Sequence, residues 1–108
     1  MPDRIYTTYI ISNKYNTCIY VGITNNIERR INEHRTKYNP RSFSAHYNTH
    51  KLLFFQHYGS PLEAIAREKQ IKRWNRNKKL QLIQIYNPKF IDLYDFALTG
   101  EEIVPRED

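Results

Sequence analysis

The residues best able to do chemistry are polar side chains that stand where a helical pattern calls for apolar ones. In residues 60–74, apolar side chains recur at helical spacing, and Glu68 falls in the middle of their arc. In residues 27–38, His34 falls inside the apolar arc and Arg30 lies on its shoulder. Burial of a charged or strongly polar group without partners is costly, so these three residues need a reason.

Each of the three also has a purely structural explanation. Lys72 follows Glu68 by four residues, in the order that favours an ion pair on a helix surface. His34 could be an ordinary half-buried histidine bonded to a backbone carbonyl. Arg30 could pack its stem against apolar surface while its guanidinium stays in water. Structural and chemical explanations therefore both stay open.

Tyr9 and Tyr20, each in a strand-like segment, complete a set of five side chains that suits hydrolysis of a phosphodiester. The carboxylate of Glu68 could hold Mg²⁺ while water fills most of the coordination shell. The guanidinium of Arg30 matches a phosphate with two parallel donors and keeps its charge. His34 or a tyrosine could accept the proton of water. The ordinary pKa values are ~6.5 for histidine and ~10 for tyrosine, so a tyrosine needs a metal-bound water or nearby cations for this role.

Charge is distributed unevenly along the chain. The 108 residues hold 17 Lys and Arg against 11 Asp and Glu, a net charge of +6. Residues 92–108 contain six of the acids and one base, so residues 1–91 carry a net charge of +11. A body this basic attracts polyanions, and nucleic acid is the first candidate. A solvated, highly charged surface is the alternative.

Two short segments rich in β-branched and aromatic residues predict an antiparallel hairpin. They are residues 6–11 (YTTYII) and 18–23 (CIYVGI). The six polar residues between them favour a turn. If Ile11 pairs with Cys18 across this loop, Tyr9 lies opposite Tyr20 on one face of the sheet.

Further elements follow from apolar runs and from helix start and stop signals. They are a helix over 27–38, a strand over 52–55 and helices over 61–74 and 80–86. Asn25 and Glu28 are spaced as in a capping box, and so are Ser60 and Glu63. The pair Asn87-Pro88 is expected to end the last helix. The predicted order β-β-α-β-α-α describes a small α/β domain of the α+β type.

Residues 1–95 are expected to form one domain, and residues 96–108 an acidic, frayed tail. No apolar run approaches the ~18–20 residues of a membrane span, and the amino-terminal residues lack the apolar region of a secretory signal. Cys18, a lone cysteine, cannot form an intramolecular disulfide. A cytoplasmic location is therefore expected, with no membrane partner.

Taken together, these motifs resemble the GIY-YIG endonuclease superfamily. Within it, the chain is similar to small stand-alone bacterial proteins that resemble the catalytic domain of the excision-repair incision subunit. The matching segments are 7–9 (TTY), 20–22 (YVG), 26–30 (NIERR), 64–74 (AIAREKQIKRW) and 82–88 (LIQIYNP). The resemblance covers about residues 5–95, and Thr7 replaces the first glycine of the family motif.

The resemblance implies a three-stranded antiparallel sheet with flanking helices and metal-dependent hydrolysis of DNA phosphodiesters, in DNA repair or recombination. It implies that Glu68 binds Mg²⁺, with Mn²⁺ as a substitute, and that Arg30 stabilises the scissile phosphate. Tyr9 is expected to position or deprotonate the attacking water. Tyr20 is expected to assist in orientation, and His34 to accept a proton.

Three further residues match the family or its hairpin without a clear role. Lys72 and Asn87 stand at family positions whose role the sequence does not assign. Gly22 lies on the same strand face as Tyr20, where it lets a backbone approach closely or simply ends the strand.

Basic residues on two of the predicted helices, and in the segment before the last one, form the expected nucleic-acid footprint. A solvated helix face is the alternative. The basic residues are Arg29, Arg35, Lys37, Lys69, Lys72, Arg73, Arg76, Lys78 and Lys79. Trp74 is expected in the core rather than as a stacking platform, and the scattered histidines do not predict a zinc site.

The alternative function is a nucleic-acid-binding module of the same fold whose catalytic site is idle. A third is an accessory protein that binds another protein.

Overall fold

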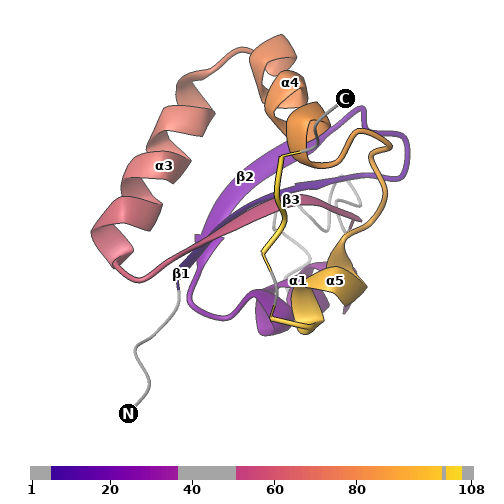
Figure 1. Ribbon diagram of the computed structural model, residues 1–108. Helices are drawn as coiled ribbons and strands as arrows, with labels where there is room; N and C mark the ends of the chain where they lie inside the picture. Colours follow the sequence, from indigo (N-terminus) through magenta and orange to yellow (C-terminus); the bar gives the residue numbers. More distant parts are fainter. Residues whose placement is uncertain (1–5, 37–50, 101, 106–108) are drawn as a thin grey trace.

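The computed structural model describes residues 6–36, 51–100 and 102–105, except for the side chains of residues 34–36. A three-stranded antiparallel sheet forms its centre, in the order β2-β1-β3 (Figure 1). The strands are β1 (Tyr6–Ser12), β2 (Ile19–Thr24) and β3 (Lys51–Tyr58). The predicted sheet and the β-β-α-β-α-α order are confirmed.

Helices cover both faces of this sheet. They are α1 (Ile27–Thr36), α3 (Pro61–Arg73), α4 (Arg76–Tyr86) and α5 (Tyr94–Leu98). Figure 1 shows α1 and α5 on one side of the sheet and α3 and α4 on the other. Among the described residues, no helix is long and apolar enough to cross a membrane.

Two apolar clusters fill the spaces between sheet and helices. The cluster under α1 and α5 contains Tyr9, Ile11, Ile31, Leu52, Phe55, Leu93 and Ala97. The cluster under α3 and α4 contains Ile10, Val21, Leu53, Phe54, Ile71, Leu82 and Ile83. Residues 52–55 of β3 supply both clusters, because successive side chains of a strand point to opposite faces of the sheet. The pairing with β1 shifts between Ile10 and Ile11, and this irregularity leaves Leu53 and its neighbour Phe54 in the same cluster.

The predicted register of the hairpin is wrong by two residues. Ser12 pairs with Ile19 and Ile11 with Tyr20, so Tyr9 lies opposite Gly22 rather than Tyr20. The cause is a tighter turn, in which Asn13 remains paired with Cys18. A shift of two keeps every side chain on its face, so Tyr9 and Tyr20 still share one face of the sheet.

Helix caps also differ from the expected ones. The side chain of Asn26, not Asn25, caps α1 by accepting a hydrogen bond from Arg29 N at 3.0 Å. The Ser60 side chain makes no capping bond, so the predicted capping box is absent there. Asn75 caps α4 through Lys78 N at 2.8 Å, and the helix therefore begins at Arg76, four residues earlier than expected.

Helix α5 was not predicted, and the expected boundary at residue 95 falls inside it. The helix is tied to β3 by a 2.7 Å bond from Leu93 N to Leu52 O. Leu93 and Ala97 are each only 7% exposed. Five residues are too short for a visible helical period, so tertiary contacts decide this element.

Asn87 joins α4 to the sheet and has a structural role. Its Nδ2 donates to Leu53 O at 3.1 Å and to Ile91 O at 2.8 Å, while its Oδ1 accepts from Ile91 N. The residue is 4% exposed. These bonds satisfy backbone groups that burial would otherwise leave unpaired.

Replacement of Asn87 should therefore destabilise the fold. We expect Asn87→Ala to lower the free energy of unfolding by about 2 kcal/mol, because buried carbonyls lose their donor. Urea unfolding measures the change, with Gln84→Ala at an exposed site of the same helix as control. Equal stability of the two variants would contradict this role.

Candidate active site

The ring of Tyr9 crosses from β1 over the backbone of Gly22 in β2. A Cβ atom built on Gly22 would stand 2.5 Å from both Cζ and the hydroxyl oxygen of Tyr9. No real side chain tolerates such a contact unless the ring moves. Of the two expected explanations for Gly22, the structure therefore supports the close approach.

The phenol of Tyr9 is deeply buried, with 1% of the residue exposed. Burial raises its pKa well above the usual value. The Arg30 guanidinium acts in the opposite direction, while Tyr20, Glu33 and Glu68 add to the rise in pKa. The phenol is thus neutral at physiological pH, and the charges of Arg30, Glu33 and Glu68 act on its pKa.

Arg30 lies on α1, on the face of the sheet that carries Tyr9. Its Nε lies 3.5 Å from Glu33 Oε1, and its side chain is 40% exposed. Nε itself is buried and has no hydrogen-bond partner among the described residues. The arginine is therefore held by an ion pair within its own helix while part of the side chain remains open to solvent.

Glu68 reaches the same region from α3, which packs against β1 and β2 on the other face of the sheet. Its side chain is only 15% exposed, and its Oε2 lies 3.4 Å from Lys72 Nζ. The Lys72 ammonium also lies 5.9 Å from the ring centroid of Tyr20. Because β2 is an edge strand, side chains from α3 can reach past it.

Four of the five predicted catalytic residues, Tyr9, Tyr20, Arg30 and Glu68, thus gather around β2. The ion pair expected for Glu68 and Lys72 is present, although this carboxylate is far more buried than its partner. His34 follows Arg30 by one turn in α1, but its side chain lies outside the described residues. Its role stays a sequence-based prediction.

The residues at β2 fit Mg²⁺ better than zinc. Within the described residues, no group of three or more His, Cys, Asp and Glu could hold a metal ion. Zinc sites use three or four protein ligands, whereas Mg²⁺ keeps several waters and binds one or two carboxylates together with substrate phosphates. The half-buried carboxylate of Glu68 matches the second pattern.

The predicted basic footprint divides between two faces. Lys69, Lys72 and Arg73 are exposed on α3, and Arg76 and Lys78 on α4, whereas Arg29 is exposed on α1. Lys79 is half-buried. Arg35 and Lys37 lie outside the side chains that the structure describes.

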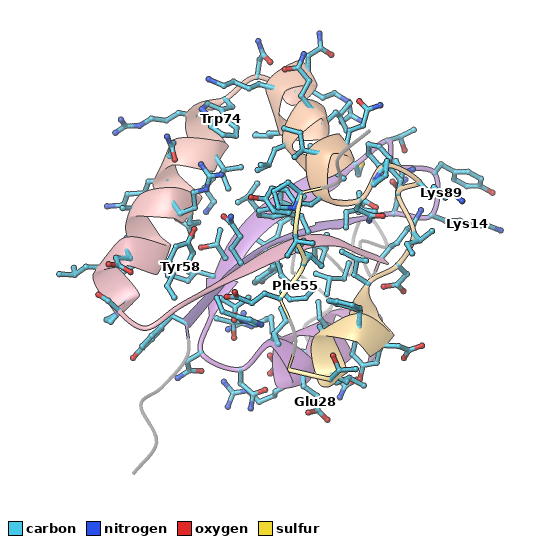
Figure 2. All side chains as sticks on the ribbon, in the orientation of Figure 1. Lys14, Glu28, Phe55, Tyr58, Trp74 and Lys89 are labelled. Atoms are coloured by element: carbon cyan, nitrogen blue, oxygen red, sulfur yellow. The ribbon has the colours of Figure 1, made fainter. Side chains whose placement is uncertain are left out.

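Trp74 lies at the end of α3 and packs against the cluster under α3 and α4, as expected (Figure 2). Lys78 Nζ and Arg67 Cζ lie 4.6 Å and 5.3 Å from its ring centroid. These two cations already occupy the surroundings of the indole.

A separate hollow lies at the opposite edge of the sheet, between β3 and residues 102–105. It has a volume of about 220 Å³ and is lined by Phe55, Gln56, His57, Tyr58, Tyr86, Glu102, Ile103 and Pro105. Thr7 Oγ1 contacts His57 Nδ1 there at 2.8 Å, and burial lowers the pKa of this histidine. None of the predicted catalytic residues lines it.

Sequence reasoning missed Glu33 as a neighbour of the site. It pairs with Arg30 and raises the pKa of Tyr9. The spacing of three residues between Arg30 and Glu33 was an available signal, because such pairs lie on one helix face.

Comparison with known proteins gives a family match and two relatives of similar sequence. The GIY-YIG catalytic domain matches residues 5–81. A UPF0213 protein of Clostridium perfringens is 38% identical over 65 residues, covering 60% of this chain and 69% of that protein. A UPF0213 protein of Syntrophus aciditrophicus is 35% identical over 71 residues, covering 66% and 80%.

A solved structure shares the fold. The solution NMR structure of a UPF0213 protein from Bacillus halodurans aligns with a TM-score of 0.54 at 22% identity, covering 86% of this chain and 97% of that chain. At this identity the likeness concerns the fold alone.

The contact between Tyr9 and Gly22 leads to a stability prediction. We expect Gly22→Ala to lower the free energy of unfolding by about 1–3 kcal/mol, because the buried ring must move. Gly59→Ala is the matched control, since nothing lies within 4 Å of a Cβ there. Similar unfolding curves for both variants would show that the ring does not need the glycine.

The buried phenol of Tyr9 leads to a prediction about alkaline pH. Above about pH 10 the unfolded chain releases the Tyr9 proton while the folded protein retains it, so stability falls as pH rises. The contribution is complete below that pH and decreases by at most about 1.4 kcal/mol per pH unit above it. Tyr9→Phe should therefore lose less of its free energy of unfolding than the wild type as the pH rises. Urea unfolding between about pH 9 and 11 measures this difference. Equal pH slopes for wild type and variant would contradict a raised pKa.

Proposed function

This chain belongs to the GIY-YIG family, and we propose that it is a metal-dependent endonuclease that hydrolyses DNA phosphodiester bonds, acting in DNA repair or recombination. The family's catalytic domain implies a nuclease-type fold and a nucleic-acid substrate. The observation that carries the proposal is the gathering of Tyr9, Tyr20, Arg30 and Glu68 around one edge strand.

In this proposal, Glu68 holds the metal ion, which GIY-YIG nucleases typically use. When bound, Mg²⁺ or Mn²⁺ supplies a Lewis acid at a phosphate oxygen. Lys72 neutralises the Glu68 carboxylate in the protein alone and can turn to a phosphate when that carboxylate binds a metal ion. A lysine has the flexible stem that this exchange requires.

Arg30 binds the scissile phosphate. Its guanidinium keeps its charge throughout and offers two parallel donors to two phosphate oxygens. The charge of the phosphate grows as water attacks, and a fixed cation stabilises that state more than the starting one. The ion pair with Glu33 holds the arginine in place for this role.

Tyr9 orients the attacking water. Its phenol is neutral because burial raises its pKa, so it acts first as a hydrogen-bonding group. Cations beside it lower that pKa, as Arg30 does, and so favour the ionised phenolate, which is the form of Tyr9 that can accept a proton from water. Tyr20 contributes to orientation, and His34 is the second candidate for the proton.

Cleavage of several DNA forms tests the proposal. Plasmid, single-stranded and branched DNA are each incubated at low salt with Mg²⁺, Mn²⁺ or EDTA. We expect cleavage that requires the metal. Binding of DNA without any cleavage by the folded protein would contradict the proposal and favour the idle binding module.

Replacement of Glu68 should affect the cleavage rate and leave the stability of the fold intact. We expect Glu68→Gln to lower cleavage at least about 100-fold while the melting temperature is unchanged or higher, because a desolvated carboxylate is removed. Glu63→Gln, at an exposed site of the same helix, is the control and should cleave normally. If Glu68→Gln instead unfolds the protein, the carboxylate is a structural member of its ion pair.

Arg30 should affect catalysis more than binding. We expect Arg30→Ala to reduce the cleavage rate at least about tenfold more than it reduces DNA affinity, since its main contact is to the reacting phosphate. The neighbouring variant Arg29→Ala should reduce both by the same factor. Equal losses for Arg30→Ala would make it one phosphate contact among several.

A further inference from the structure

We propose that the turn between β1 and β2 is a second DNA contact, at which the ring of Tyr15 stacks on an unpaired base of the substrate. This inference rests on the proposed function and defines its substrate class as DNA with a single-stranded segment. The turn comprises residues 13–18, and its tip holds Lys14 and Tyr15.

The turn is rigid because its own side chains hold it. Asn13 Oδ1 accepts bonds from Thr17 N at 2.8 Å and Cys18 N at 3.0 Å, and Asn13 Nδ2 donates to Thr17 Oγ1 at 2.6 Å. Asn16 adopts a left-handed conformation with φ of 58°, and its Oδ1 accepts from Ser12 Oγ at 3.2 Å. A preordered turn loses little entropy when it binds a ligand.

Two cations from other elements fix the turn to the body of the protein. Arg76, at the start of α4, donates to Asn16 O at 2.5 Å. Lys51, at the start of β3, donates to Asn16 Oδ1 at 3.2 Å. The turn is therefore a defined part of the surface, and its surroundings are basic.

Tyr15 stands on this turn with 74% of its surface exposed. The ammonium of Lys14 lies 5.7 Å from its ring centroid. Figure 2 shows Lys14 at the outer end of the hairpin. Asp92 is the nearby acid on the β3 side, and its Oδ1 accepts bonds from the backbone of Leu52 and Tyr94.

An exposed aromatic ring among cations matches a nucleic-acid strand. The cations can pair with the phosphates, and the ring can stack on the face of a base. In a duplex the base faces are covered by neighbouring pairs, so a tyrosine on a turn can stack only where a base is unpaired. The proposed occupant is thus a single-stranded segment beside the cleavage point.

The turn and the candidate active site are continuous along β2. Tyr20 follows the end of the turn by two residues, and Lys72 lies over its ring. Arg76, which binds the turn, follows Lys72 by four residues. A strand whose phosphate reaches Glu68 and Lys72 can therefore extend past Arg76 to Tyr15.

The test compares the binding of single-stranded, branched and fully paired DNA in EDTA, where no cleavage occurs. Fluorescence anisotropy of labelled DNA gives the affinities of the wild type, Tyr15→Phe, Tyr15→Ala and Leu62→Ala. Leu62 is the control because it is 77% exposed at the beginning of α3. Thermal melting confirms that each variant is folded.

We expect Tyr15→Ala to weaken binding of single-stranded and branched DNA at least about fivefold, with duplex affinity unchanged within about twofold. Tyr15→Phe and Leu62→Ala should bind as the wild type does, because stacking needs the ring and not the hydroxyl. Equal affinities of Tyr15→Ala and wild type for every DNA form would overturn this inference alone. Absence of DNA binding by the wild type would overturn the proposed function as well.

Discussion

The approach of the Tyr9 ring to the backbone of Gly22 is the contact on which the candidate site depends. It requires a residue without a side chain directly opposite Tyr9, so it is compatible only with the observed register of β1 and β2. It also places the phenol where burial raises its pKa and where the charges of Arg30 and Glu68 act on it. The close approach of the Tyr9 ring to Gly22 thus links the register of β1 and β2 to the position of the phenol in the candidate site.

The position of β2 at the edge of the sheet explains how two layers contribute to one site. Arg30 comes from α1 on one face, and Glu68 comes from α3 on the other. A central strand would separate these helices, whereas side chains can pass an edge strand. Each charge has an ion-pair partner on its own helix, Glu33 for Arg30 and Lys72 for Glu68. These two ion pairs neutralise the charged side chains of the site while no nucleic acid is bound.

Much of this arrangement was predictable because burial follows periodicity. The place of Glu68 in the apolar arc of its helix predicted a half-buried carboxylate, and this is present. The apolar run 52–55 predicted a buried strand, and this is also present. The register was not predictable, since bonds from the Asn13 side chain set the length of the turn. Helix α5 depends on the packing of Leu93 and Ala97, which no local pattern encodes.

The proposed chemistry depends on a metal ion held by Glu68 beside Tyr9 and Arg30. The most direct measurement is NMR of the protein titrated with Mn²⁺, which broadens the amide signals of residues near the ion. We expect selective broadening of the amide signals around Glu68, Gly22 and Arg30, and loss of that broadening in Glu68→Gln. Broadening confined to the acidic residues 92–108, or broadening unchanged in the variant, would contradict it.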